Sequence, residues 1–327
     1  MTGEASVIPL GQLLAGRGSS GPECWIGPGL LPPRGILFVG GEPKVGKSLL
    51  VANLALALAA GQDRAGFQVP CPRRVLMCQF ELPVDLFAGR MAAMRSGLGA
   101  TAADTDFLVD TRAAGHLLSA PQGLNHFLAS ARAARAEVIV LDPLYSAHDR
   151  DENDTQAMAG LCQSLLRLRE ASKAALIVVH HVRKSAAREE VGSAFRGSSA
   201  LHAVGDSYLL ARACGQTAGA VELRFQFRYA AAPPPRRLRL DPDTLWFAES
   251  GGAAPEPGPR RKVEGEDVRQ ALTALGGTAR FNPLRDQLMA RTQSSNRTAQ
   301  LAVADACQRG LIARQPDGTY FLPAQAG

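Results

Sequence analysis

The sequence contains no long apolar run. Its longest, residues 49–60, is shorter than the roughly 20 residues that a membrane-spanning helix needs. The chain also does not open with a charged segment followed by an apolar one, which is the pattern of a secretion signal. We therefore expect no membrane partner and a cytoplasmic location, with residues 49–60 forming a buried helix.

Cysteine spacing of the kind that binds zinc is also missing. The six cysteines never occur as CxxC or in any other zinc-like arrangement. This absence excludes the common zinc modules. It favours free thiols in a reducing compartment, in agreement with the cytoplasmic location.

Lysine is scarce, because only five of the 36 basic residues are lysines. Two of these five, Lys44 and Lys47, lie within one eight-residue stretch, residues 41–48. The formal net charge of +6 agrees with a polyanionic partner without requiring one. The concentration of lysine in one short stretch is therefore more informative than the overall charge.

Length and composition predict a large domain with a small appendage. A chain of 327 residues, 46% of them apolar, can bury a sizeable core. Pro- and Gly-rich stretches without apolar periodicity mark an irregular N-terminal arm and a linker. The expected organisation is the arm at 1–34, a main domain at 35–248, the linker at 249–262 and a C-terminal domain at 263–327.

Short apolar runs alternate with helical patterns through the main domain. Strands are predicted at 36–39, 74–80, 138–141 and 175–179, and helices at 48–61, 83–98, 121–135 and 155–172. This alternation predicts an α/β fold with a mostly parallel sheet that is covered on both faces. Further strands at 208–211, 221–229 and 236–240 are expected to be antiparallel at the edge of the sheet.

Residues 41–48, Gly-Glu-Pro-Lys-Val-Gly-Lys-Ser, fit the pattern GxxxxGK[ST] without a mismatch. Glycines let backbone N–H groups turn toward phosphate oxygens, and the following helix adds the positive end of its dipole. Lys47 would reach the β and γ phosphates of ATP, and the Ser48 hydroxyl would bind Mg²⁺. The predicted nucleotide-binding residues are Gly41, Glu42, Pro43, Lys44, Val45, Gly46, Lys47, Ser48 and Leu49.

Two carboxylates follow predicted strands at the edge where the phosphate-binding loop lies. Asp142 ends the run Val-Ile-Val-Leu-Asp, where a carboxylate can hold the Mg²⁺ shell. Glu81 follows the strand at 74–80 and would orient or deprotonate the attacking water. The alternative for Glu81 is an acid that stabilises the start of the next helix, which opens at Leu82-Pro83.

His180 and His181 follow the strand at 175–179, again at its carboxyl end. One of them can form a hydrogen bond to the γ-phosphate and transmit its presence to the basic loop that follows. A lone histidine is more often structural, but the pair and the adjacent loop favour a functional role.

These motifs, in this order, resemble those of the RecA-like ATPases. GEPKVGKS, the strand ending at Glu81, VIVLDPL, VVHHVRK and RGSSA are most similar to the RepA-type hexameric replicative helicases of plasmids and phages. The resemblance covers about residues 20–248. It implies a ring, most simply a homo-hexamer, that passes single-stranded DNA through its centre.

The resemblance also implies roles for single residues. Glu81 matches the catalytic glutamate of the family, and His181 matches its γ-phosphate sensor. The channel-lining loops of the family correspond to about 146–156 and 183–198 here. The cations of the second loop that would meet DNA phosphates are Arg183, Lys184, Arg188 and Arg196.

The family supplies cations to the nucleotide of a neighbouring subunit from a Lys-x-Arg pair. This sequence has Gln226-Phe-Arg228 at the matching place, so the arginine is present and the lysine is not. The resemblance therefore implies a catalytic role in trans for Arg228.

The C-terminal segment shows three helical patterns, at 264–275, from Asn282-Pro283 to about 291, and from Ser294 or Ser295 to 309. A hairpin signal around Pro316-Asp317-Gly318 follows them. Three helices and a hairpin predict a winged helix-turn-helix. Its third helix would place Asn296, Arg297 and Gln300 in the major groove of duplex DNA. The alternative is a module that binds another protein.

The hypothesis that unites these features is a RecA-like ring ATPase that acts on DNA, most like a RepA-type helicase. It uses ATP and Mg²⁺ and carries a winged-helix domain. One alternative is a DNA-binding initiator or regulator that uses ATP as an assembly switch without unwinding. A small-molecule kinase is disfavoured, since kinases lack the His pair, the basic loop and a DNA-binding appendage.

Overall fold

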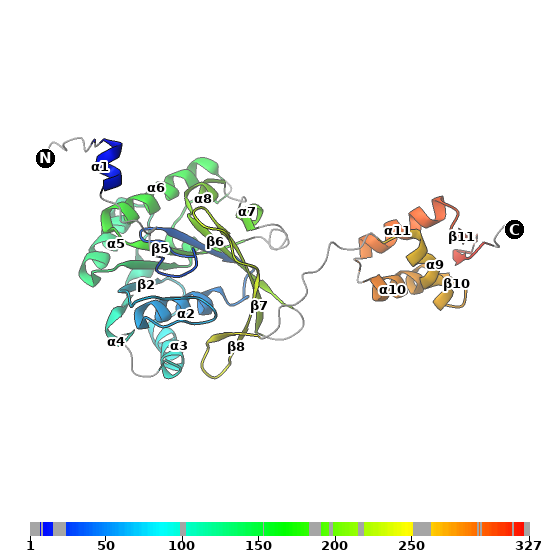
Figure 1. Cartoon of the computed structure of the whole chain (residues 1–327), viewed down its shortest axis with the longest axis horizontal. Coiled ribbons are helices and arrows are strands. Elements are labelled where there is room, and N and C mark those ends of the chain that lie inside the picture. Colours follow the sequence, from blue (N-terminus) through cyan, green and yellow to red (C-terminus); the bar gives the residue numbers. More distant parts are fainter. Residues whose placement is uncertain are drawn as a thin grey trace. The chain divides into compact units, whose positions relative to one another are not determined.

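The computed structural model describes residues 7, 9–15, 24–98, 103–152, 154–182, 191–195, 199–214, 219–250, 263–292, 294, 296–315 and 317–323. The chain divides into two compact units, Met1–Gly252 and Ala253–Gly327 (Figure 1). Within the described residues, no helix is long and apolar enough to cross a membrane.

The described part of the first unit is built on a nine-stranded sheet. From one edge to the other it runs β3 (Phe107–Asp110), β2 (Val75–Gln79), β4 (Val138–Asp142), β5 (Ala175–His181), β1 (Ile36–Gly41), β6 (Ser207–Ala213), β7 (Ala220–Phe227), β8 (Arg236–Leu240) and β9 (Phe247–Glu249). The strands from β3 to β6 are parallel, and β7, β8 and β9 continue the sheet in antiparallel pairs. The predicted α/β fold with a mostly parallel sheet is confirmed.

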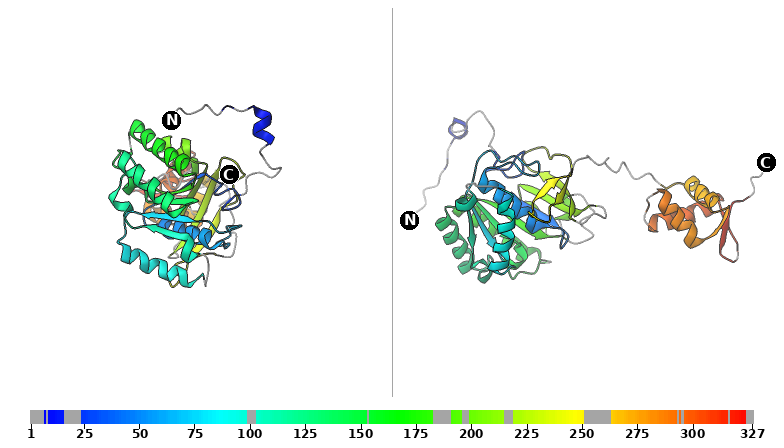
Figure 2. Two further views of the ribbon diagram at one scale, coloured as in Figure 1. Left: turned by 90° about the vertical axis from the view of Figure 1, so that its left-hand side faces the viewer. Right: turned by 90° about the horizontal axis from the view of Figure 1, so that it is seen from below.

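The central strands are apolar on both sides because helices cover both faces of the sheet. Along β1, Leu37 and Val39 belong to one core, whereas Ile36 and Phe38 belong to the core on the opposite face. Helices α2 (Lys47–Ala60) and α3 (Val84–Ser96) cover the first face (Figure 2). The second face is covered by α5 (Pro121–Ala134), α6 (Thr155–Ser172) and α8 (Ser199–Val204).

Helix α2 follows the phosphate-binding loop directly and is buried along nearly its whole length. Its run of leucine and alanine packs between the sheet and neighbouring helices, so it has no polar face to expose. The short remaining elements are α1 (Leu10–Ala15), α4 (Ala103–Asp106), η1 (Ala113–Gly115), η2 (Leu144–Ala147) and α7 (Val191–Ala194).

Three departures from the expectation concern the sheet and the core of the first unit. Strands β3 and β9 were not predicted, because both lie near the edges of the sheet and are short. Residues 24–34, expected to belong to an irregular arm, place Ile26, Leu30 and Leu31 in the core of the first unit.

The described part of the second unit contains three helices and a small antiparallel sheet. The helices are α9 (Gly265–Ala274), α10 (Phe281–Thr292) and α11 (Asn296–Gln308). Each of them begins and ends within two residues of the corresponding predicted helix. Strands β10 (Thr278–Arg280), β11 (Ala313–Arg314) and β12 (Thr319–Phe321) pair in the order β10-β12-β11. The unit has its own core, which includes Val268, Leu284, Val303 and Tyr320.

Candidate functional site: a phosphate-binding loop at the carboxyl edge of the sheet

The loop of residues 42–46 joins β1 to α2 and depends on glycine at both ends. Gly46 has φ 98°, a left-handed conformation that other residues rarely adopt, and a Cβ there would lie 3.1 Å from the ring of Phe247. A Cβ on Gly41 would lie 2.5 Å from the carbonyl oxygen of Ala211. The loop thus forms a narrow cradle that side chains at these two positions would distort.

Lys47, the first residue of α2, is buried and turns its ammonium group back into this loop. Its Nζ donates hydrogen bonds to the carbonyl oxygens of Gly41 and Glu42, both at 2.9 Å. Burial lowers the pKa of Lys47 to about 8, although the carboxylates of Asp142 and Glu81 raise it in part. A desolvated ammonium group at the mouth of a loop of backbone N–H groups suits a phosphate oxygen.

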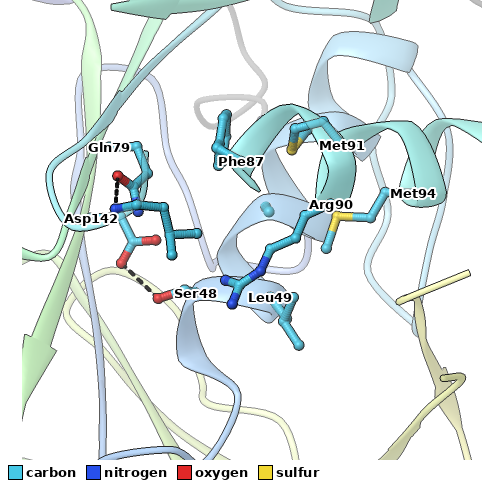
Figure 3. A pocket seen from close by; sticks show the side chains of 10 residues that line it. Ser48, Leu49, Gln79, Phe87, Arg90, Met91, Met94 and Asp142 are labelled. Carbon is cyan, nitrogen blue, oxygen red and sulfur yellow. Dashed lines mark hydrogen bonds between the residues drawn. The ribbon is translucent and has the colours of Figure 1, made fainter. Parts of the chain in front are cut away.

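Ser48 and Asp142 form the second part of the site (Figure 3). The Ser48 hydroxyl donates a hydrogen bond of 3.0 Å to Oδ1 of Asp142, the last residue of β4. Burial raises the pKa of Asp142 to about 6, and the bond from Ser48 and the charge of Lys47 lower it in part. A hydroxyl and a carboxylate are hard oxygen ligands, which fit the preference of Mg²⁺.

Glu81 lies two residues beyond the end of β2, with its side chain exposed to solvent. Ser146 of η2 donates a hydrogen bond of 3.4 Å to its Oε1. Its charge raises the pKa values of Lys47, Asp142 and His181, which places it within electrostatic reach of all three groups. Glu81 is therefore an accessible carboxylate beside the loop, as water activation requires.

His181 ends β5, the strand between β4 and β1, and is paired in register with Gly41. Burial and the nearby charge of Lys47 lower its pKa, so at neutral pH the imidazole is uncharged. Within the described part of the chain, its Nδ1 is buried and has no hydrogen-bonding partner. A neutral imidazole can donate or accept one hydrogen bond through this nitrogen.

His180 points to a different environment from His181. It is buried, its pKa is lowered to about 4 mainly by burial, and its Nδ1 lies 3.8 Å from Oε1 of Glu152. Nε2 of His148 lies 3.9 Å from the same oxygen. This cluster connects the end of β5 to the segment after η2.

Arg90 is a residue of the site that the sequence motifs do not reveal. It lies on α3, and its side chain extends toward Ser48 beside a small cavity that Leu49, Phe87 and Asp142 also line (Figure 3). Its charge lowers the pKa of Asp142. The one signal in the sequence is helical spacing, since Arg90 lies one turn after Phe87 on the face that packs toward α2.

Arg228 lies at the amino ends of the parallel strands, whereas the phosphate-binding loop lies at their carboxyl ends. It directly follows β7, where Phe227 pairs with Ser207 at the amino end of β6, whereas Gly41 pairs with Ala211 further along the same strand. The guanidinium donates a hydrogen bond of 2.8 Å to the carbonyl oxygen of Ala203. Arg228 thus does not contribute to the phosphate site of its own chain.

The candidate DNA contacts are only partly covered by the described residues. Arg183, Lys184, Arg188 and Arg196 lie outside them. Asn296 and Gln300 are exposed on α11, and Arg297 belongs to the same helix, but its side chain is not among those described. Their role in DNA binding therefore stays a prediction.

The fold and the site together define a P-loop nucleotide-binding protein with a RecA-like α/β core. A family model described as an AAA domain (AAA_25) matches residues 12–187, which is more than half of the chain, and the chain belongs to this family. No curated protein matches the chain.

Two solved structures share the fold at 12% sequence identity and a TM-score of 0.51 each. The first is the ATPase domain of G40P, and the alignment covers 67% of this chain and 85% of the G40P chain. The second is a DnaB-like replicative helicase, described with its interactions with primase. That alignment covers 66% of this chain and 59% of the helicase chain. At this identity the likeness concerns the fold alone.

Proposed function

We propose that the protein is an ATP-hydrolysing ring ATPase that acts on DNA, most like a RepA-type replicative helicase. The observation that carries this proposal is the convergence of five side chains at the carboxyl ends of four adjacent strands. They are Lys47 and Ser48 after β1, Glu81 after β2, Asp142 at the end of β4 and His181 at the end of β5. Each residue type matches one task of phosphoryl transfer to water.

The division of tasks follows from the geometry. Lys47 neutralises charge on the β and γ phosphates, because its buried ammonium group already lies in the loop. Ser48 and Asp142 would hold Mg²⁺, which supplies further neutralisation of the phosphates. Glu81 is left free of the metal pair, since its exposed carboxylate is bonded to Ser146 instead. It would therefore orient the attacking water.

Arg90 extends this set on the side of α3. Because its guanidinium extends toward Ser48 and its charge lowers the pKa of Asp142, it adds positive charge next to the proposed metal ligands. We propose that it stabilises the charge that develops on the leaving phosphate oxygens.

Steady-state hydrolysis and strand displacement together test the proposal. We expect ATP hydrolysis that depends on Mg²⁺ and is stimulated by single-stranded DNA, with displacement of a paired strand only when ATP is present. Hydrolysis without displacement would support the initiator or regulator that uses ATP as an assembly switch. Absence of hydrolysis under all these conditions would contradict an ATPase.

We predict that Arg228→Ala leaves nucleotide binding by the dilute chain unchanged and lowers the turnover of the assembly by about tenfold or more. The reason is the position of Arg228 at the edge opposite its own phosphate-binding loop, so that it can meet only the nucleotide of another copy. The measurements are equilibrium nucleotide affinity and steady-state ATPase at high protein concentration.

Mixing experiments provide the control for Arg228. Arg228→Ala subunits retain Glu81, and Glu81→Gln subunits retain Arg228, so mixed interfaces contain one complete site. A mixture of the two impaired variants should be more active than either variant alone. A mixture that is no more active than its components would argue against a role in trans.

We further propose that the second unit is a winged helix that binds duplex DNA through α11. Its helix order and three-stranded sheet, order β10-β12-β11, agree with such a module. Asn296 and Gln300 are exposed near the start of α11, and Arg314 lies on β11. One feature favours the alternative of a protein-binding module, namely Leu301, which is 63% exposed on the same helix.

Removal of residues 263–327 should leave basal ATPase and its stimulation by single strands nearly intact. Every residue of the phosphate site, including Phe247 beside Gly46, lies before residue 250. Duplex affinity should fall, with a smaller salt dependence in proportion to the lost phosphate contacts. Arg297→Ala alone should cost about 1–3 kcal/mol of duplex binding if Arg297 contacts a base edge.

Duplex affinity across a salt series decides between the two roles of this unit. The whole chain, residues 1–250 and residues 263–327 are compared at equal salt. If the C-terminal fragment does not bind DNA while residues 1–250 bind duplex as tightly as the whole chain, the unit contacts protein instead.

A further inference from the structure

Asp206 is a buried charge at the amino edge of the parallel strands, in the turn between α8 and β6. Its Oδ2 accepts a hydrogen bond of 2.9 Å from the backbone N–H of Ile36, and its own N–H donates to the carbonyl oxygen of Ile36 at 2.9 Å. Ile36 is the first residue of β1, whose other end leads into the phosphate-binding loop. The carboxylate is thus fixed to the strand that carries the nucleotide site.

The same carboxylate faces two guanidinium groups. Nη1 of Arg228 lies 3.8 Å from Oδ1, and Nη1 of Arg169 on α6 lies 3.9 Å from Oδ2. The backbone N–H of Arg228 donates to the carbonyl oxygen of Asp206 at 2.9 Å, and its Nη2 donates to Ala203. The guanidinium of Arg228 is therefore held against its own chain by one carbonyl oxygen and one carboxylate.

The contacts of the Arg228 guanidinium with its own chain are weak enough to break reversibly. Its side chain is 45% exposed, so water and salt screen its attraction to Asp206. The carboxylate is only 7% exposed and is fixed by the Ile36 amide, so it cannot follow the guanidinium outward. Any contact of Arg228 with another anion must therefore break its pairing with Asp206.

We propose that Asp206 is a positioning residue that competes with the nucleotide phosphates of a second copy for Arg228. This inference rests on the proposed role of Arg228 in trans. It assigns to Asp206 the control of when the Arg228 guanidinium can reach a second copy. The Asp206 carboxylate keeps the guanidinium on its own chain until the phosphates of a neighbouring site outcompete it. Because Asp206 also binds the first residue of β1, release of Arg228 changes the charge balance at the strand that leads to its own phosphate-binding loop.

The substitution Asp206→Asn separates the structural part of this residue from its charge. An amide oxygen still accepts the N–H of Ile36, so the tie to β1 is kept. The negative charge that attracts Arg228 is lost, which leaves the guanidinium freer to reach a second copy. The full-length chain is assayed at high concentration with single-stranded DNA, and turnover is measured against ATP concentration.

We expect Asp206→Asn to lower the ATP concentration for half-maximal turnover by about two- to fivefold, the range that a half-exposed ion pair supports. The same substitution in the Arg228→Ala background should have no effect, because no guanidinium remains to be released. Nucleotide affinity of the dilute chain and its melting temperature should not change. Arg169→Gln, which removes the other cation beside the same carboxylate, serves as a control and should not lower the half-maximal ATP concentration.

An equal shift in both backgrounds would overturn the proposal, since Asp206 would then act through β1 and not through Arg228. An unchanged or raised half-maximal ATP concentration in the single variant would also overturn it. If Arg228→Ala lowers turnover while Asp206→Asn changes nothing, this inference fails alone. If Arg228→Ala does not lower the turnover of the assembly, the role in trans fails and this inference falls with it.

Discussion

The Lys47→Ala variant is expected to lose ATP affinity and turnover together. Its ammonium group is buried at the start of α2 and already makes two hydrogen bonds of 2.9 Å inside the loop. Removing it leaves the β and γ phosphates without their nearest positive charge, in a site where little water can replace it. Loss of a buried charge partner costs about 2–5 kcal/mol, which is roughly 30-fold or more in affinity.

Equilibrium nucleotide binding and steady-state ATPase measure this effect. Arg132→Ala is a matched control, because it also removes one positive charge, from an exposed position on α5 at the other face of the sheet. The control should behave like the unaltered chain. If Lys47→Ala kept ordinary ATPase activity, the assignment of the phosphate-binding loop would be wrong.

The phosphate site could be predicted from the sequence because its parts are encoded locally. A buried strand, a glycine-containing loop and a helix are consecutive in residues 36–60, so their spacing alone fixes how Lys47 and Ser48 lie. Asp142 ends a continuous apolar run and His181 is the second residue after one, and parallel strands bring such ends to one edge of the sheet. Position along the chain was therefore sufficient to place these residues together.

Other features depend on contacts between distant segments and leave little trace in the sequence. Arg90 joins the site only because α3 packs on the face where its side chain extends to Ser48. Phe247 closes the space beside Gly46 from about 200 residues away. Strand β3 is half-exposed, so it lacks the continuous apolar run by which buried strands are recognised.

The N-terminal segment illustrates the same limit. Proline and glycine around Ile26 and Leu31 predicted an irregular arm, yet both side chains are fully buried in the first unit. The chain there is irregular locally, as its composition indicates, yet Gly27 pairs with Gln68 and the neighbouring apolar side chains belong to the core of the first unit. Composition predicts backbone conformation in such a segment, whereas tertiary contacts decide whether it belongs to the core.

The Glu81→Gln variant is expected to bind ATP normally and to lose hydrolysis by about 10²- to 10⁴-fold. Glutamine keeps the size of the side chain and a hydrogen-bond acceptor for Ser146, which lies 3.4 Å from Oε1. It cannot accept a proton from water, so only the chemical step is affected. Lys47, Ser48 and Asp142 are untouched, and they are the proposed contacts to the phosphates and the metal.

The alternative role for Glu81 is stabilisation of the N-terminus of α3, and a second substitution separates the two roles. Asp85 is an exposed acid in the first turn of that helix, where the helix dipole favours negative charge. Asp85→Asn should lower the melting temperature slightly and leave turnover intact. If Glu81→Gln gave the same small loss of stability with normal turnover, Glu81 would be a helix-stabilising acid. If it lost ATP binding and turnover together, Glu81 would be needed to form the site and not to activate water.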